Sequence, residues 1–191
     1  MAEEKNTDII ISQESLSQFF FKNLSNVNKK SICPVPEEFI LYTSEVLDKY
    51  ALSQEFFELD SGKVQEKLVG PRILEADRLS NNERIEVYKD VGDTVLVLLS
   101  LFKKRVEKKL LTQNYYLKMA RSAYFSMGHL DCNFYDIPDF YNLFASSLER
   151  TIAVVETMFK SSNYKSLENF LLHEGDESDF ILLQNISKKV S

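Results

Sequence analysis

Glycine and proline are scarce in this chain of 191 residues, which contains only 5 Gly and 4 Pro. A protein built mainly from strands needs many tight turns, and these two residue types form most of them. Their scarcity therefore favours long helices. Hydrophobic residues nevertheless make up 44% of the chain, including 14 Phe and 9 Tyr, and a domain of this length can bury roughly 70% of its unfolded surface. The composition predicts one all-α domain.

Residues that bind metals, form disulfides or act as nucleophiles are also few. Cys33 and Cys132 lie far apart and form no CxxC pair, so we interpret them as two reduced thiols. The two histidines, His129 and His173, are too few for a three-histidine metal site, and both are interpreted as helix-end residues that assist carbonyl groups. Neither a Glu-x-x-His nor a His-Glu-x-x-His motif occurs, and glycine-rich phosphate loops are missing. The sequence therefore predicts no metal, no cofactor and no catalytic residue.

Positive charge and long hydrophobic runs are the remaining deficits. The net charge of −6 argues against a general nucleic-acid-binding protein, which usually has a basic surface. The longest apolar run, residues 95–102, is far shorter than the ~20 residues that cross a bilayer. Residues 1–11 begin with acidic side chains and lack the basic start of a signal peptide. We therefore expect a cytoplasmic protein without a membrane span.

One basic cluster departs from this acidic composition. Residues 103–109 contain five basic side chains and one acidic one. At the C-terminal end of a helix, cations complement the helix dipole, so we interpret the cluster as a solvated helix end. The alternative is a contact with phosphate groups or nucleic acid.

Residues 83–109 contain the pattern around which we expect the domain to be organised. One helix face carries apolar residues three and four positions apart, namely Tyr88, Val91, Val95, Leu98, Leu99, Phe102 and Val106. Over residues 95–102 the apolar side chains almost circle the axis, which requires other helices on several sides. Ser80 and Glu83 have the spacing of a capping box and mark the start. The sequence predicts a central buried helix over about 83–109.

We expect this helix to lie in a bundle of seven or eight. Periodicity and capping residues predict the others over residues 12–27, 36–60 (as one helix or two), 63–69, 115–127, 137–159, 164–173 and 179–186. The helix over 115–127 should pack antiparallel against the central helix, since its small residues Ala120 and Ala123 allow close approach. We expect flexible ends at 1–11 and 188–191 and a single domain over 12–187.

The Gly92-Asp93 pair marks the point where the exposed back of the central helix becomes buried. Glycine within a helix costs about 1 kcal/mol relative to alanine, so Gly92 indicates close packing or a bend. Asp93 is either solvated beside Lys89 or partly buried, and a buried carboxylate needs a partner, for which Arg121 is a candidate. A folding ion pair or a plain surface aspartate is the simpler interpretation. The functional one is the wall of a ligand pocket formed with Tyr115, Tyr116, Arg121 and Tyr124.

Three short motifs, Val91-Gly92-Asp93, Tyr115-Tyr116 and Ala123-Tyr124, lie between Asn82 and Gly128. With them this segment, about a quarter of the chain, resembles a family of bacterial helical proteins without assigned function, in which a Gly-Asp helix precedes a Tyr-Tyr…Ala-Tyr helix. The resemblance implies a bacterial cytoplasmic protein and gives weight to the residues of the three motifs. It implies no activity, cofactor or partner. The chain departs from the family before Phe102, where the family has a Ser-Gly-Phe-like sequence.

These observations lead to three hypotheses of function. The first is a non-enzymatic helical protein that binds another protein or forms a homodimer, with a possible regulatory role, because aromatic residues are in surplus at the predicted helix edges. The second is a small-molecule-binding or sensory domain with its pocket between the central helix and the helix over 115–127. The third is nucleic-acid binding through residues 103–109, against which the net charge argues.

Overall fold

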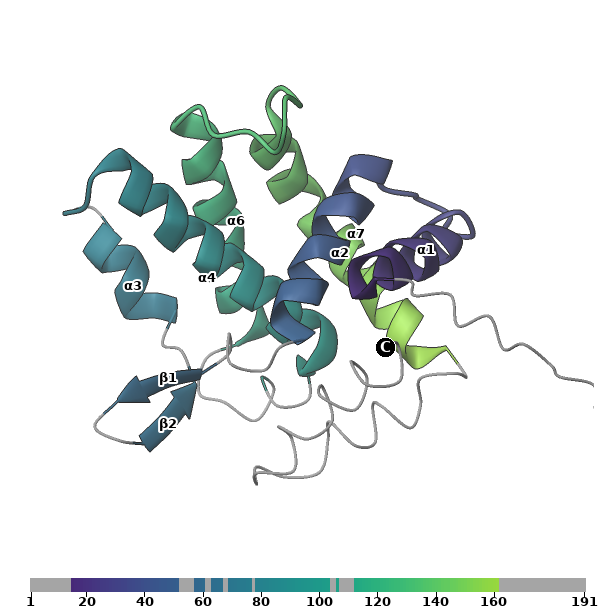
Figure 1. Ribbon diagram of the computed structural model, residues 1–191, viewed down its shortest axis with the longest axis horizontal. Coiled ribbons are helices and arrows are strands. Elements are labelled where there is room, and N and C mark those ends of the chain that lie inside the picture. Colours follow the sequence, from purple (N-terminus) through teal and green to yellow (C-terminus); the bar gives the residue numbers. More distant parts are fainter. Residues whose placement is uncertain are drawn as a thin grey trace, which may run out of the picture.

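A computed structural model describes residues 15–51, 57–60, 63–66, 69–76, 78–103, 106 and 112–161. Six helices lie within these ranges: α1 (Leu16–Asn28), α2 (Glu37–Ala51), α3 (Val69–Ala76), α4 (Asn81–Leu101), α6 (Gln113–His129) and α7 (Phe140–Lys160). The packed helical bundle is confirmed (Figure 1), whereas the number of seven or eight helices is not. The helices predicted over 164–173 and 179–186, and both predicted flexible ends, lie outside the described residues.

The central helix is α4. All ten residues from Val91 to Ser100 are buried, so the helix is covered on every side over this stretch. It packs against α3, α6, α7 and α2, and Figure 1 shows it between α3 and α2 with α6 behind. The predicted burial over this stretch is therefore confirmed.

Hydrogen bonds at the start of α4 explain why it begins where the sequence indicated. The Glu83 carboxylate accepts from the backbone N–H of Ser80 at 2.9 Å and from its hydroxyl at 2.7 Å. The same bonds lower the pKa of Glu83, because they favour its charged form.

The end of the central helix was predicted wrongly. α4 ends at Leu101, eight residues before position 109, because Phe102 leaves the helical conformation with φ −115° and ψ 27°.

Two other helix starts differ from the sequence prediction. α1 is capped at Ser15, where Ser15 and Gln18 form a capping box, and position 12, where this helix was predicted to begin, lies outside the described residues. α7 begins at Phe140 after Asp139, which has a positive φ of 56°, instead of starting at residue 137. Aspartate tolerates this left-handed conformation better than most residues.

A β-hairpin occupies residues predicted to be helical. β1 (Phe57–Asp60) pairs antiparallel with β2 (Lys63–Glu66), with Phe57 opposite Glu66 and Asp60 opposite Lys63. The predicted helices over 36–60 and 63–69 are therefore wrong for these eight residues. Two residues, Ser61 and Gly62, separate the strands in the sequence, and a two-residue link with glycine is typical of a hairpin.

The helices α4 and α6 run antiparallel at close range. Gly92 of α4 lies under the ring of Tyr124 on α6, so that a Cβ atom at position 92 would be only 2.7 Å from two ring carbons. Further along, Leu99 near the end of α4 and Leu117 near the start of α6 line the same groove. The missing side chain of Gly92 therefore provides the space for the Tyr124 ring.

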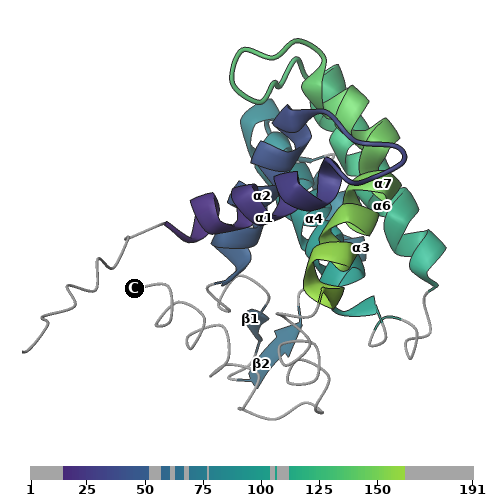
Figure 2. The same cartoon turned by 90° about the vertical axis from the view of Figure 1, so that its right-hand side faces the viewer.

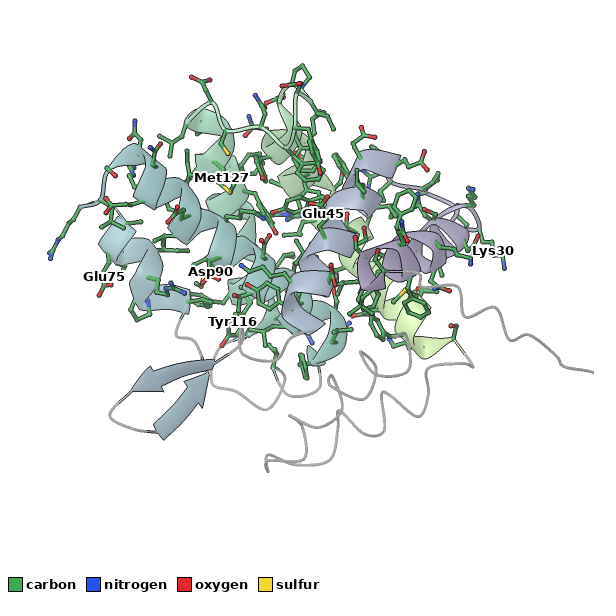
Figure 3. All side chains as sticks on the ribbon, in the orientation of Figure 1. Lys30, Glu45, Glu75, Asp90, Tyr116 and Met127 are labelled. Carbon is green, nitrogen blue, oxygen red and sulfur yellow. The ribbon has the colours of Figure 1, made fainter. Side chains whose placement is uncertain are left out.

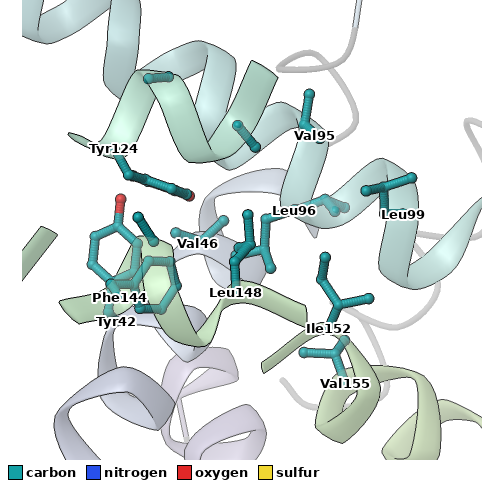
Figure 4. Close-up of a cluster of buried hydrophobic side chains, with 14 of the residues drawn as sticks. Tyr42, Val46, Val95, Leu96, Leu99, Tyr124, Phe144, Leu148, Ile152 and Val155 are labelled. Atoms are coloured by element: carbon teal, nitrogen blue, oxygen red, sulfur yellow. The ribbon is translucent and has the colours of Figure 1, made fainter. Parts of the chain in front are cut away.

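Aromatic rings fill the core where α2, α6 and α7 meet. The ring of Tyr42 on α2 lies 4.9 Å from Phe144 of α7 and 6.2 Å from Tyr124 of α6. Figure 4 shows these three rings together, with Leu148 and Leu96 continuing the core along α7 and α4. On the other side of α7, α1 packs next to it, as both orientations show (Figures 1 and 2). α1, α2, α6 and α7 thus each bury a face in this core, and α4 is covered on every side over residues 91–100.

Gly92→Ala should destabilise the protein by about 1–3 kcal/mol, because the added methyl group overlaps a buried ring that has no room to move. Urea unfolding followed by circular dichroism measures this loss. Gly70→Ala on α3 is the matched control, since its Cβ would meet only the Tyr115 hydroxyl at 3.4 Å. Equal stabilities of the two variants would contradict the close packing at Gly92.

Candidate functional site

Asp93 carries a carboxylate that is fully buried in the protein interior, with 0% of its surface exposed. It lies on α4 between Gly92 and Thr94, within the stretch that other helices cover. An ionised carboxylate in such a place costs several kcal/mol unless hydrogen bonds and an opposite charge compensate for the lost water. The neighbours of Asp93 provide both.

Three donors from three helices surround this carboxylate. The hydroxyl groups of Tyr42 and Tyr124 both donate to Oδ1, at 2.6 Å and 2.9 Å. The Lys89 ammonium, one turn earlier on α4, donates to Oδ2 at 2.8 Å. We refer to Asp93, Tyr42, Tyr124 and Lys89 as the Asp93 cluster. It joins α2, α4 and α6 through one side chain.

Lys89 covers the cluster from the solvent side. Its side chain is 41% exposed, whereas that of Asp93 is completely enclosed. The ammonium group also donates to the Tyr42 hydroxyl at 3.1 Å and lies 4.6 Å from the centre of the Tyr42 ring. A cation over an aromatic face adds a favourable interaction. Lys89 thus balances the buried charge while its own charge remains in contact with water.

The environment keeps the tyrosines of the cluster protonated. Burial, and next the negative charge of Asp93, raises the pKa of Tyr42 and that of Tyr124 well above the usual value. Burial also raises the pKa of the neighbouring Tyr141, which stacks on Tyr124, and that of Tyr50. These hydroxyl groups therefore remain hydrogen-bond donors throughout the physiological pH range.

A second group of polar contacts continues along α4. The Tyr50 hydroxyl of α2 lies 2.8 Å from the Thr94 hydroxyl and 3.3 Å from the Asp90 carboxylate. Arg72 of α3 forms an ion pair with Asp90, and Lys49 of α2 lies 3.9 Å from the same carboxylate. Asp90 thus links α3 and α2 to α4, as Asp93 links α2 and α6 to it.

The candidate site residues do not form one pocket around Asp93. Tyr124 contacts Asp93 directly, and Tyr116 is buried farther along α6. Tyr115 is 41% exposed, and its ring packs edge-on against Tyr116. Arg121 lies on the edge of α6 facing α7, where it pairs with Glu149 at 3.5 Å. The candidate partnership between Arg121 and Asp93 is therefore replaced by the Lys89 ion pair.

Tyr42 is the member of the cluster that the sequence interpretation missed. It lies three residues after Phe39 and four before Val46, which is the spacing of the buried face of α2. That spacing identifies it as a core residue. Its hydroxyl group could not be assigned to Asp93, because the two residues are 51 positions apart.

Two open grooves flank the outward face of α7, away from the Asp93 cluster. The α6–α7 groove has a volume of about 350 Å³ and is lined by Leu99, Lys103, Leu117, Glu149, Ile152 and Glu156, among others. The α1–α7 groove, of about 410 Å³, is lined by Val27, Lys30, Cys33, Arg150, Val154 and Thr157, among others. Ala153 lines both grooves. The small side chain of Ala153 therefore lies on the ridge between them.

Charged residues that line the α6–α7 groove pair with one another. Lys103 forms an ion pair with Glu156 at 3.2 Å, and both residues line the α6–α7 groove. Most residues of the basic cluster 103–109 lie outside the described part of the chain.

Within the described ranges no group of three or more His, Cys, Asp or Glu side chains is arranged to hold a metal ion. In the same ranges, no helix has both the length and the hydropathy needed to cross a membrane.

Comparisons with known proteins found no matching protein family, no matching curated protein and no matching solved structure. The resemblance of residues 82–128 to a bacterial helical family therefore stays a prediction.

Tyr124→Phe should lower the free energy of unfolding by about 1–3 kcal/mol, because the buried carboxylate loses one of its two hydroxyl donors. Tyr115→Phe is the matched control on the same helix, since its ring is partly exposed. Chemical denaturation of both variants measures the difference. A Tyr124→Phe variant as stable as the control would show that the hydroxyl group contributes nothing.

Alkaline pH should unfold the protein through its buried tyrosines. Because their folded-state pKa values are raised, the stability that they contribute is complete below about pH 10 and decreases above it, where the unfolded chain loses these protons. Each such tyrosine steepens the loss by about 1.4 kcal/mol per pH unit. The slope for Tyr124→Phe should be shallower by that amount in denaturation series above pH 10; an unchanged slope would contradict the raised pKa.

Proposed function

We propose that the protein acts by binding a helix of another protein chain, a second copy of itself or a different protein, along the outward face of α7. The observation that carries the proposal is the position of Ala153, which lines both grooves. A small residue on a ridge between two grooves allows a second helix to approach closely while its larger side chains enter the grooves. The function proposed is one of binding and not of catalysis.

The pattern of exposed residues on α7 supports this proposal. Exposed positions recur three and four residues apart on the outward face, at Leu143, Ser146, Arg150, Ala153, Thr157 and Lys160. This is the spacing with which one helix packs along another. Leu143 begins the series and is 52% exposed. Because most of the series is polar, it favours a reversible contact over an obligate one.

The two edges of the face differ in charge. On the α6 side, Glu149 and Glu156 form ion pairs with Arg121 and with Lys103 and Lys160. On the α1 side, Lys30 and Arg150 give the groove a positive wall. A partner helix with an acidic edge would therefore be favoured in one orientation.

The Asp93 cluster supports a structural and not a catalytic assignment of the buried residues. Both carboxylate oxygens accept hydrogen bonds from side chains of the protein, and Asp93 has no exposed surface. A substrate could reach it only by displacing these donors. We therefore propose that the cluster stabilises the scaffold that presents α7. We propose the cytoplasm as the compartment of the protein.

Small-molecule binding in the α6–α7 groove is the second candidate. Its volume of about 350 Å³ lies within the usual range for ligand sites, and Leu99, Leu117 and Ile152 provide an apolar floor. The end of the central helix contributes Leu99 to this groove and the helix over 115–127 contributes Leu117, whereas Asp93 does not line it. A metabolite-library screen by thermal shift tests this candidate. Stabilisation lost in Leu117→Arg would favour it over protein binding.

Ala153→Arg should weaken binding of the partner, or dimerisation, by at least about tenfold. The long arginine side chain on the ridge would block the close approach of a second helix. Light scattering across a concentration series measures self-association, and affinity capture from lysate measures other partners. Ser122→Arg on the exposed face of α6 is the matched control and should bind normally. A strict monomer that captures no partner, or equal binding by both variants, would overturn the proposal.

A further inference from the structure

We propose that the C-terminal segment of the same chain, residues 162–191, docks into the α1–α7 groove. The groove has an apolar floor that includes Val27 and Val154, the ridge residue Ala153 along one edge, and a positive wall formed by Lys30 and Arg150. Figure 3 shows Lys30 at the outer end of α1. The groove therefore fits an occupant that combines apolar side chains on one face with carboxylates.

The position of the last described residue directs the chain toward this groove. Ser161 ends α7 and is itself one of the residues that line the groove. It has an extended conformation, with φ −63° and ψ 150°, which turns the chain out of the helix. The residues that follow thus start at one end of the groove. A segment tethered there has a high effective concentration for this site.

The sequence of the segment matches the groove in length and in the order of its side chains. Residues 164–173 have the periodicity of a helix, which would be about 15 Å long, and the α7 residues from Arg150 to Ser161 span a similar length. A helical hairpin that turns at residues 161–163 runs the segment back along α7. The segment is then long enough to cover the whole groove.

This antiparallel arrangement brings complementary residues together. In the proposed arrangement Phe170 would lie near Val154 and Leu171 near Ala153, so that apolar side chains would meet the apolar residues of the groove. The next six residues, 174–179, include four acidic side chains. In this arrangement they would reach the end of the groove where Arg150 and Lys30 form its positive wall. Apolar and charged residues are thus in register with the groove at the same time.

The occupied groove would restrict access to α7 from the α1 side and leave the α6–α7 groove open. The inference goes beyond the proposed function and does not depend on it. Docking is measured on the purified protein alone, whereas partner binding is measured by light scattering and capture. The docked segment and a partner helix would compete for Ala153, which lines both grooves. Because docking and partner binding are measured separately, the failure of one is distinguishable from the failure of the other.

Cys33 provides a direct probe, because it is exposed and lines the groove near its positive end. We would introduce Glu174→Cys into the full chain, with Cys132→Ser so that no other thiol competes, and follow disulfide formation with Cys33 under diamide. The disulfide should form within one chain, at least about tenfold faster than in a matched protein with Lys188→Cys in place of Glu174→Cys. Added Phe170→Asp or Arg150→Glu should slow it, while Lys118→Glu on α6 should not.

Each other outcome overturns the inference. Equal rates for the Glu174→Cys and Lys188→Cys proteins would show that the segment has no preferred position. Rates that do not respond to Phe170→Asp and Arg150→Glu would show that groove contacts play no part. A disulfide that joins two chains, visible as a dimer on a denaturing gel, would show that the segment covers a second copy instead.

Discussion

The enclosed carboxylate of Asp93 is the interaction on which the arrangement of the helices depends. A charge with no exposed surface is tolerated only when its lone pairs are occupied and an opposite charge is close. Tyr42 and Tyr124 occupy one oxygen, and Lys89 occupies the other. These donors come from α2, α6 and α4, so the carboxylate is satisfied only when all three helices are in their native positions. Removing one of these helices would leave the carboxylate only partly compensated.

Gly92 and Asp93 act together as neighbours. The glycine leaves the space into which the Tyr124 ring packs, and this close approach brings the Tyr124 hydroxyl to the adjacent carboxylate. An alanine at position 92 would push the ring outward and lengthen that hydrogen bond. The cost of a glycine within a helix is about 1 kcal/mol. The structure offsets it with a charge-assisted hydrogen bond and with the burial of a large aromatic side chain.

Polar contacts along α4 also position the helices that share little other surface with it. α2 lies beside α4, and its Tyr42 and Tyr50 reach Asp93, Thr94 and Asp90 with their hydroxyl groups. Hydrogen bonds of this kind are directional, whereas apolar packing alone permits small shifts along the helix axis. The polar residues of α4 therefore fix the register of α2, and the apolar residues supply most of the driving force.

Local sequence signals were sufficient for some parts of the fold and not for others. The capping box of Ser80 and Glu83 and the apolar stretch before Phe102 depend on neighbours in sequence, so they predicted the start and the burial of α4. The two tyrosine partners of Asp93 lie on other helices, so they depend on the angle between helices. Arg121 lies on the same helix as Tyr124, but its side chain faces α7 and not α4, which periodicity alone does not distinguish.

The hairpin shows a second reason for error. Residues 52–69 contain apolar side chains at spacings that also fit a helix, and the strands are only four residues long. The period of such a short stretch is ambiguous, so the Ser-Gly pair at 61–62, a sequence typical of hairpin links, is the better signal. For the candidate site, the sequence identified Asp93 and Tyr124, whereas the two grooves depend on the packing of α1, α6 and α7.

The most direct test of the central role of Asp93 is the free energy of unfolding of Asp93→Asn, measured by urea denaturation. The amide would keep the shape but remove the charge, and its NH₂ group would face the Lys89 ammonium. We expect a loss of about 3 kcal/mol, against less than about 0.5 kcal/mol for the exposed control Glu86→Gln on the same helix. Equal stability of Asp93→Asn and the wild-type protein would contradict the account.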